Sequence, residues 1–498
     1  MAAKAKPSAM ESPVVVASNR GPVSYARDDR GRLVPSKGAG GLVTAMAGVF
    51  FHDDATWVAA ALTDEDVEIA RGGRAVGAGT NYRMRFVHIP PDRFDLYYNE
   101  FSNRVLWFAH HYLWDVPRTP SFGAETSVAW EAYSEVNAAF ARALAKEARR
   151  DPAILVQDYH LTLVPRMLRE SAPGARILHY SHTPFAGQQF LRILPTRIRE
   201  AILRGMAGAD VVGFQSRAWA ENFLLSARHV PSLHVDLRAG RVTDDEGHTA
   251  QVRVFPVAIN PHALREAAES AEAQAGRQEV EEIRGDRTLM LRVDRLEPSK
   301  NILRGFQAYE LLLKQHREWR NEVTFLALLS PSRDKLVEYQ SYADDCLAAA
   351  DRINEEYGTR SWRPIHVKVQ EDFLYAVGAY GAYDALVVNP VFDGMNLVAM
   401  EGPLMNDRHG ALVLSHNAGA FERIGRYAFG TNPFDIQETA EAMYAALELP
   451  AEERQRRARG LTRSVLAHTP ETWLWNQLAA IDDATGRKSG SQRVQQRR

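Results

Sequence analysis

Short apolar runs rich in β-branched residues recur along this chain, and stretches with helical periodicity separate them. They lie at 14–17, 154–157, 177–180, 211–214, 289–293, 323–329, 365–369, 385–388 and 411–414. Runs that are apolar on both faces and alternate with helices are typical of parallel sheets covered on each side. The sequence therefore predicts an α/β protein, and the two series of runs predict two doubly wound domains.

The length of the chain and the positions of its prolines predict its division. At 498 residues the chain is too long for one ordinary domain, so we expect two large ones. Pro256 and Pro261 bracket a short apolar segment, which indicates the boundary, and Trp473 and Trp475 indicate a docked terminal helix. We predict a disordered tail, two Rossmann-like domains, a terminal helix and a second disordered tail at 1–13, 14–258, 259–470, 471–485 and 486–498, with one surface helix over 265–284.

Composition excludes several classes of protein and partner. The 60 basic and 62 acidic side chains nearly cancel, so no net charge attracts the chain to nucleic acid or to an anionic membrane. The single cysteine, Cys346, excludes a disulfide framework and a thiol-rich metal site, and it fits a reducing compartment. No apolar run approaches the roughly 20 residues of a membrane helix, and the first residues lack the apolar core of a secretory signal. We therefore expect a cytoplasmic protein.

Residues 393–401 follow the run at 385–388 and combine an acidic residue, a flexible turn, a helix start and a glutamate one turn inside that helix. Such a helix start presents free backbone N–H groups and a positive helix end beside two carboxylates, Asp393 and Glu401. A nucleotide sugar needs this combination, because amides bind the diphosphate and carboxylates bind hydroxyl groups. The alternative is an ordinary strand-to-helix loop with two solvated acids.

Two further segments offer groups that bind anions. Arg295 and Lys300 lie in a loop that opens a helix, where two cations neutralise a leaving diphosphate; a charged helix start is the alternative. Arg20 follows the run at 14–17 and offers a fork for phosphate. The glycine cluster at 38–41 lets backbone N–H groups approach an anion closely, although most glycine clusters are plain turns.

Histidine and aspartate residues follow two other predicted strands. His182 and Asp158, at the tips of neighbouring strands, are able to hold sugar hydroxyls or to share a proton, although a lone histidine is more often structural. The adjacent His110 and His111 suggest a metal site. Adjacent histidines usually point apart, however, and no helix-spaced third ligand accompanies them. We therefore predict no metal site.

An aromatic and amide-rich segment at 97–103, which contains Tyr98 and is followed by Trp107, suits the face of a sugar. A ring packs on the C–H groups of a sugar, and amides bind its hydroxyls. Ordinary packing of aromatic rings in a core explains the pattern equally well. Arg333, after the run at 323–329, is a further loop arginine that we expect at the same site.

Seven motifs in order resemble the trehalose-6-phosphate synthase family of retaining glycosyltransferases, family 20, over residues 14–480. They are S-N-R at 18–20, G-G-L at 40–42, Y-Y-N-E-F-S-N-x-V-L-W at 97–107, Q-D-Y-H-L at 157–161, H-T-P-F at 182–185, R-L-E-P-S-K at 295–300 and D-G-M-N-L-V-A-x-E at 393–401. The resemblance implies the GT-B fold, in which two Rossmann-like domains hold the active site in the cleft between them. The first domain is then the acceptor side and the second the donor side, and the terminal helix crosses back to the first domain.

The activity implied by the resemblance is transfer of glucose, with retention, from an NDP-glucose to glucose 6-phosphate, which forms α,α-trehalose 6-phosphate. Attack in this family is thought to occur on the front face within an ion pair, without a covalent intermediate, metal or other cofactor. The resemblance implies catalytic roles for Arg295, Lys300, His182 and Asp158; donor-binding roles for Gly40, Gly41, Arg295, Lys300, Asp393, Asn396, Leu397 and Glu401; and acceptor-binding roles for Arg20, Tyr98, Trp107, Asp158 and Arg333.

Three positions depart from the family pattern. Ala60 stands where a second tryptophan is common, so part of the acceptor pocket must be rebuilt. Met400 replaces a lysine before the helix glutamate, and Pro403 falls early in that helix, where it removes a backbone hydrogen bond.

Segments at 120–123, 193–195 and 432–435 resemble an actinobacterial branch of the family that includes the validoxylamine phosphate synthases, which use a GDP-linked donor. We therefore favour GDP-glucose over UDP-glucose. One alternative, left open by Ala60, is a pseudo-glycosyltransferase that joins a GDP-cyclitol to an aminocyclitol phosphate by a C–N bond. A second is an inactive regulatory relative that binds sugar phosphates, although the donor-site residues are present. A homo-oligomer is also left open.

Overall fold

The computed structural model describes residues 13–37, 46, 55–73, 76–77, 82–333 and 336–487. The chain divides into two compact units, each described separately below. Unit 1 consists of Met1–Val257 and Pro470–Arg498, and unit 2 of Ala258–Thr469. The predicted site residues Gly40 and Gly41 lie outside the described residues, as do both predicted tails apart from residues 13, 486 and 487.

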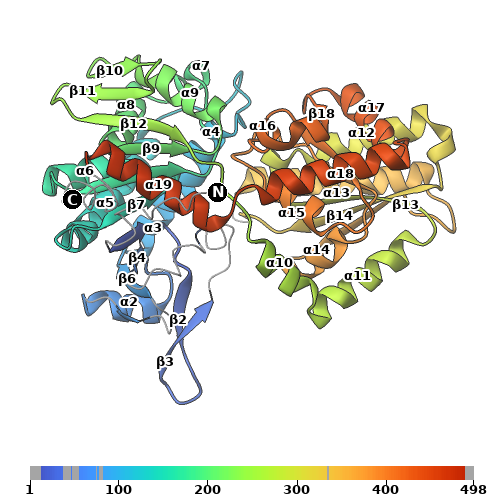
Figure 1. The fold of residues 1–498 in the computed structure, drawn as a ribbon, viewed down its shortest axis with the longest axis horizontal. Helices are drawn as coiled ribbons and strands as arrows, with labels where there is room; N and C mark the ends of the chain where they lie inside the picture. The colour runs from blue at the N-terminus through green and yellow to red at the C-terminus, as the bar shows by residue number, and fades with distance from the viewer. Residues whose placement is uncertain are drawn as a thin grey trace, which may run out of the picture. The chain divides into compact units, whose positions relative to one another are not determined.

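The described part of unit 1 contains a ten-stranded sheet in the order β10-β11-β12-β9-β8-β7-β1-β4-β6-β5 (Figure 1). Strands β12 to β6 in this order are parallel, and antiparallel pairs close both edges. A separate antiparallel hairpin, β2–β3, extends from the unit (Figure 1). The strands are β1 (Val14–Ala17), β2 (Val23–Arg27), β3 (Leu33–Lys37), β4 (Ala55–Ala60), β5 (Val76–Gly77), β6 (Tyr82–Val87), β7 (Ala153–Gln157), β8 (Arg176–Ser181), β9 (Val211–Phe214), β10 (Leu233–Asp236), β11 (Arg241–Asp244) and β12 (Thr249–Val254).

Helices flank this sheet, and the last helix of the chain packs on β8 and β9. The helices are α2 (Asp64–Arg71), α3 (Pro91–Asp95), the π-helix η3 (Leu96–Trp107), α4 (Phe108–His110), α5 (Ala124–Ala148), the 3₁₀-helix η4 (Tyr159–Leu161), α6 (Val164–Ser171), α7 (Gln188–Leu191), α8 (Thr196–Ala207), α9 (Arg217–Ala227) and α19 (Pro470–Ala484).

Helix α19 is fixed to unit 1 by an aromatic contact and a buried ion pair. Trp473 is 3% exposed and donates its indole N–H to the carbonyl of Phe255 at 2.9 Å, and the hydroxyl of Tyr180 donates to the same carbonyl. Arg176 and Asp482 are almost fully buried and pair at 3.2 Å. Removing one partner of such a pair leaves an uncompensated buried charge, so α19 is an integral part of unit 1.

The described part of unit 2 contains a six-stranded, entirely parallel sheet in the order β15-β14-β13-β16-β17-β18. The chain starts at the central β13, runs outward through β14 and β15, and returns to lay β16 beside β13. The strands are β13 (Thr288–Arg295), β14 (Val323–Ser330), β15 (Ile365–Val369), β16 (Ala385–Val388), β17 (Ala411–Ser415) and β18 (Phe429–Thr431).

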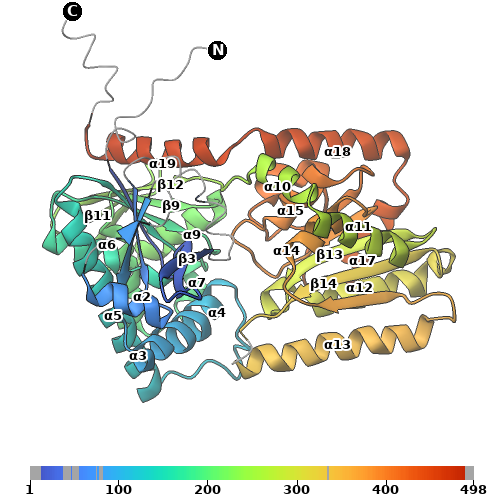
Figure 2. The ribbon, with the colours of Figure 1, turned by 90° about the horizontal axis from the view of Figure 1, so that it is seen from below.

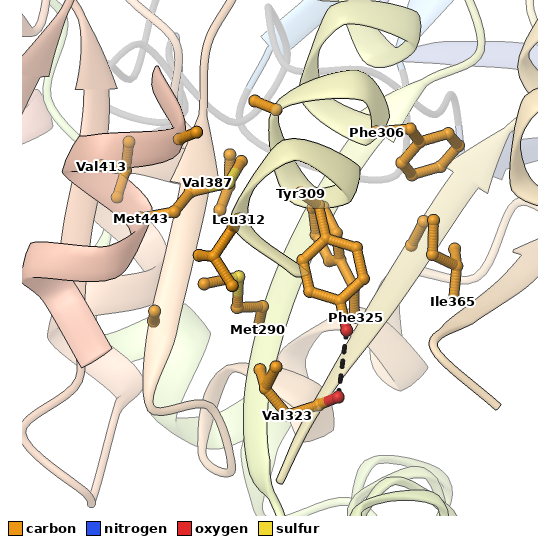
Figure 3. Close-up of a cluster of buried hydrophobic side chains, with 14 of the residues drawn as sticks. Met290, Phe306, Tyr309, Leu312, Val323, Phe325, Ile365, Val387, Val413 and Met443 are labelled. Atoms are coloured by element: carbon orange, nitrogen blue, oxygen red, sulfur yellow. Dashed lines mark hydrogen bonds between the residues drawn. The ribbon is translucent and has the colours of Figure 1, made fainter. Parts of the chain in front are cut away.

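Helices cover both faces of this sheet (Figure 2). Side chains of α12, α13 and α17 form one apolar core with the strands, and in that core the buried Tyr309 donates its hydroxyl to the carbonyl of Val323 at 3.0 Å (Figure 3). The helices are α10 (Pro261–Ala268), α11 (Ala271–Arg284), η5 (Pro298–Lys300), α12 (Ile302–Gln315), η6 (Arg317–Trp319), α13 (Val337–Tyr357), α14 (Phe373–Tyr380), α15 (Val398–Met405), α16 (Phe421–Ile424), η7 (Gly425–Tyr427), α17 (Ile436–Leu447) and α18 (Ala451–Leu466).

The architecture confirms the predicted fold class, and each apolar run named from the sequence lies within a strand. The single helix predicted over 265–284 is wrong. The chain forms α10 and α11 instead, because the hydroxyl of Ser270 accepts the N–H of Ala273 and caps a new helix. Within the described residues, no helix is long and apolar enough to cross a membrane.

Candidate functional site

Most of the predicted site residues follow the strands at which each sheet changes direction. Ligands of open parallel sheets bind beyond the carboxyl ends of the strands at such a point. In unit 2 this point lies between β13 and β16, and in unit 1 between β1 and β7. The described donor residues lie at the end of β13 or follow β13 and β16. Arg20 follows β1, and Asp158 follows β7.

Lys300 and Asp393 form the centre of the unit 2 site. The ammonium of Lys300, on η5 after β13, lies 2.5 Å from a carboxylate oxygen of Asp393, on the loop after β16. The side-chain amide of Asn396 donates to the same oxygen at 3.1 Å, and its carbonyl oxygen caps α15 through the N–H of Ala399. Two loops that are far apart in sequence therefore meet in one cluster of charged and polar groups.

The loop that carries Asp393 is held against the loop after β17. The N–H of Asp393 donates to the carbonyl of Asn417 at 3.1 Å, and its carbonyl accepts the N–H of Gly419 at 3.1 Å. A Cβ on Gly419 would lie 1.9 Å from the carbonyl oxygen of Gly394, so only glycine allows this approach. The position of Asp393 is thus set by backbone contacts as well as by Lys300.

Glu401, in the first turn of α15, accepts a hydrogen bond from the hydroxyl of Tyr380 at 3.3 Å. Desolvation raises the pKa of Glu401 to about 7, against a lowering contribution from this hydrogen bond. Met400, which stands where the family pattern has a lysine, is 1% exposed and packs in the unit. Pro403 lies inside α15, and the helix continues to Met405.

Glu297 is a site residue that the sequence analysis did not identify. Its carboxylate is completely buried and pairs with Arg295 at 3.0 Å and with Arg333 at 2.8 Å. Burial raises its pKa, but the charges of Arg295, Arg333 and Lys300 outweigh burial and hold the pKa at about 2. The position of Glu297 between Arg295 and Lys300 was the only signal that the sequence offered. The sequence did not show that its carboxylate is buried.

Arg20 and Tyr98 lie together in unit 1. The guanidinium of Arg20 donates to the hydroxyl of Tyr98 at 3.5 Å, and its carbon lies 5.6 Å from the centre of the ring. Tyr98 in turn stacks on His160, with ring centres 5.6 Å apart. Ala60, the first departure from the family pattern, is buried at the end of β4, and its N–H donates to the carbonyl of Asn19. The small side chain therefore lies next to the segment that carries Arg20.

The π-helix η3 brings Tyr98 and Trp107 to one face. The two residues are nine positions apart. In an α-helix with 3.6 residues per turn they would face opposite ways, whereas the wider i→i+5 turn, roughly 4.4 residues, returns to the same face after two turns. Consistent with this, Tyr98 stacks on His160 and Trp107 packs on the adjacent Tyr159, with ring centres 5.7 Å apart.

His182 and Asp158 also lie together. A carboxylate oxygen of Asp158 accepts the backbone N–H of His182 at 3.0 Å. The imidazole of His182 lies between Gln157, 2.9 Å from Nε2, and Gln215, 3.5 Å from Nδ1. Burial, with a smaller contribution from His179, lowers the pKa of His182 to about 3. At neutral pH His182 is therefore an uncharged hydrogen-bonding group rather than an acid.

Backbone strain coincides with these residues. Asp158, Arg333 and Asn396 have φ values of 70°, 45° and 71°, a region that non-glycine residues rarely adopt. Asn301, directly after Lys300, has a φ of 57°. Four of the eight non-glycine residues with positive φ in the described chain thus lie in or beside the candidate site. Such conformations cluster at functional sites, where surrounding contacts enforce them.

The described residues contain no group of three or more potential metal ligands. Nδ1 of the buried His110 accepts the N–H of Ala186, and His111 stacks on Trp107. The two histidines thus serve separate packing contacts. A hollow of about 710 Å³ on unit 2, lined by residues of α15, α18 and the loop after α15, includes none of the predicted site residues.

Comparisons with known proteins agree over nearly the whole chain. Residues 12–483 match the profile of Glycosyltransferase family 20. Trehalose-6-phosphate synthase of Mycobacterium leprae is 34% identical over 493 residues, which cover 96% of each chain. The UDP-forming alpha,alpha-trehalose-phosphate synthase of Schizosaccharomyces pombe is 31% identical over 481 residues, which cover 92% of this chain and 88% of the relative.

Two solved structures show the same similarity. One, described as trehalose-6-phosphate from E. coli bound with UDP-2-fluoro glucose, gives a TM-score of 0.82 at 27% identity and covers 96% of this chain and all of its own. The other is an alpha,alpha-trehalose-phosphate synthase (UDP-forming) from Burkholderia xenovorans in complex with glucose-6-phosphate. It gives a TM-score of 0.81 at 27% identity and covers 95% of this chain and all of its own.

Proposed function

The chain belongs to glycosyltransferase family 20 and is a retaining glycosyltransferase of the GT-B fold, and we propose that it forms α,α-trehalose 6-phosphate from an NDP-glucose and glucose 6-phosphate. The observation that carries this proposal is the cluster of Lys300, Asp393 and Asn396 where the unit 2 sheet changes direction. It supplies a cation for a departing diphosphate and a carboxylate for glucose hydroxyls.

Each donor-binding residue has a role that follows from the chemistry of its side chain or backbone. Arg295 and Lys300 neutralise the charge that develops on the leaving diphosphate. Asp393 accepts hydrogen bonds from the transferred glucose, while the N–H groups of Asn396 and Leu397 at the start of α15 point to the phosphates. The carboxylate of Glu401 accepts hydrogen bonds from the ribose hydroxyls. Catalysis is then positioning and electrostatic stabilisation, and no step requires a metal.

The acceptor is held by its phosphate and by its ring. Arg333 and Arg20 bind the 6-phosphate, with Tyr98 donating from its hydroxyl and Trp107 beside it. His182 and Asp158 line the sugar site as neutral and anionic hydrogen-bonding groups. Retention follows from attack on the same face from which the diphosphate leaves, with a phosphate oxygen taking the proton of the acceptor.

We further propose GDP-glucose as the preferred donor, on the segments that resemble the GDP-using branch. UDP-glucose is the alternative, since several relatives are named as UDP-forming enzymes. We also propose a cytoplasmic location, on the single cysteine.

The test is to incubate the purified full chain with glucose 6-phosphate and with GDP-, UDP- or ADP-glucose separately. We expect a disaccharide phosphate by mass spectrometry, with two α-anomeric protons by NMR, and the highest kcat/KM with GDP-glucose. A protein that makes no such product from any of the three donors would contradict the proposed reaction. Equal or better turnover with UDP-glucose would contradict the donor preference alone.

A further inference from the structure

The carboxylate of Glu297 connects two arginines that the proposed function assigns to different substrates. Arg295 ends β13, and Arg333 follows β14, its neighbour in the sheet. One oxygen of Glu297 accepts Arg295 at 3.0 Å, and the other accepts Arg333 at 2.8 Å. Arg295 is assigned to the donor diphosphate and Arg333 to the acceptor phosphate. The carboxylate of Glu297 therefore contacts one arginine for each substrate.

Two serines complete the coordination of this carboxylate. Ser299 donates its hydroxyl to the oxygen that pairs with Arg295, at 2.7 Å, and Ser332 donates to the other oxygen at 3.2 Å. Each oxygen therefore accepts one arginine and one serine. Burying a charge completely is costly unless it is paired and hydrogen-bonded, and this arrangement meets both conditions.

The two arginine side chains differ in exposure. The side chain of Arg295 is 45% exposed and that of Arg333 is 11% exposed. Arg333 also donates to the hydroxyl of Tyr339 at 3.0 Å. A guanidinium carries five N–H donors, and each fork directs one of them to Glu297. The carboxylate also separates two positive charges that would otherwise repel each other.

We propose that Glu297 is a positioning residue that sets the geometry of both phosphate-binding arginines, so that donor and acceptor affinity depend on one buried carboxylate. The inference rests on the proposed function, which assigns the two arginines to the two substrates. Glu297 touches neither substrate; it acts through Arg295 and Arg333. Loss of its charge therefore weakens the binding of both substrates together, which loss of either arginine alone does not do.

The variant that tests this is Glu297→Gln, which has nearly the same shape. The substitution removes the negative charge that both guanidiniums contact, and the NH₂ group of the new amide also replaces an acceptor by a donor at one of them. Hydrogen bonds to a charged group contribute more than neutral ones, and their loss should weaken the positioning of both arginines. We therefore expect the KM for the NDP-glucose and the KM for glucose 6-phosphate each to rise about tenfold. Dissociation constants for the free NDP and for glucose 6-phosphate, measured by calorimetry, should rise in parallel.

Asp384 provides the matched control. It is also a buried carboxylate of unit 2, pairs with Arg408 at 2.9 Å and accepts the N–H of Leu289 at the start of β13. Asp384→Asn should lower the melting temperature without changing either KM. This control separates a loss of fold stability from a loss of arginine positioning.

Three results would overturn the inference. They are KM values for Glu297→Gln within twofold of the wild type, a rise in only one of the two values, or an equal rise in Asp384→Asn. Should Glu297→Gln not fold, Glu297→Asp keeps the charge and withdraws it by one methylene. We expect that variant to raise both KM values less than tenfold, and a change in only one would be decisive against the proposal. A wild-type chain without transferase activity would instead refute the proposed function itself.

Discussion

The candidate site residues of the two units differ in how much charge they carry. In unit 2, charged groups contact each other directly: Lys300 pairs with Asp393, and Glu297 pairs with Arg295 and Arg333. In unit 1, the corresponding groups are mostly aromatic or neutral. Tyr98 stacks on His160, and His182 remains uncharged between two glutamines.

This difference matches what each proposed substrate group requires. A leaving diphosphate develops charge, and fixed cations stabilise that charge best when they are already in place. A sugar ring offers C–H faces and hydroxyls, which rings and neutral hydrogen-bonding groups bind without a large desolvation cost. Unit 2 should therefore control the rate and the binding of the phosphate groups, whereas unit 1 should control the fit of the acceptor's sugar ring. The experiments below test this division.

The largest effect is expected for Lys300→Ala. Removal of the cation should lower kcat at least a hundredfold, about 3 kcal/mol of transition-state stabilisation. Lys368, which pairs with Glu279 on the surface of the same unit, is the matched control, and Lys368→Ala should turn over normally. Steady-state turnover of the purified variants is the measurement, and near-normal turnover by Lys300→Ala would refute the assigned role.

A smaller effect should distinguish the two arginines assigned to the acceptor phosphate. Arg333 is 11% exposed in its side chain and fixed by Glu297, so Arg333→Ala should raise the KM for glucose 6-phosphate roughly ten- to a hundredfold, and far more than the KM for the donor. Arg20 is exposed and makes one long hydrogen bond to Tyr98. Arg20→Ala should therefore have a weaker effect. Equal effects of Arg333→Ala on both substrates would move Arg333 out of the acceptor site.

The smallest effect concerns the pH dependence of the KM for the donor. It should follow the protonation of a group in unit 2 and not of one in unit 1. Glu401 has a pKa of about 7, so it gains a proton as the pH falls through 7 and accepts ribose hydroxyls less well. The KM for the donor should rise, by up to about tenfold per pH unit, below pH 7. His182, with a pKa of about 3, should add no inflection between pH 5 and 9.

Glu401→Gln should abolish this pH dependence of the donor KM, whereas an unchanged profile would assign the inflection to another group. The sign of the stability effect is also fixed. Because the folded-state pKa of Glu401 lies above its ordinary value of 4.5, the folded chain holds the proton longer than the unfolded chain. Glu401 therefore reduces the free energy of unfolding as the pH rises from about 4.5 to about 7, and thermal melts of Glu401→Gln should lack that loss.

The sequence predicted most of the strands that are buried along their whole length, with β4 as an exception. Strand β14 is buried at every position except Ser330, and its apolar run was therefore visible. Strand β6 alternates buried residues with partly buried arginines, and it was not named. Strands β10 to β12, at one side of the sheet, were missed for the same reason, since each mixes buried residues with partly buried or exposed ones.

Predicting the site from sequence had a different limit. Motif order identified the side chains that reach a ligand, because those residue types have direct chemical roles. It did not identify Glu297, whose role depends on complete burial between two loops. Nor did it indicate that 96–107 forms a π-helix, because the apolar pattern of that segment resembles any helix and only tertiary packing selects the wider turn.

The buried pair of Arg176 and Asp482 has a consequence for the order in which the protein is made. Unit 2 is one continuous stretch of chain, whereas unit 1 needs α19, which leaves the ribosome after all of unit 2. A nascent chain that ends before Pro470 has no carboxylate from α19 for Arg176 and no indole from Trp473 for the carbonyl of Phe255. We therefore expect the second unit to fold first during synthesis, while the first stays incomplete until α19 has been made.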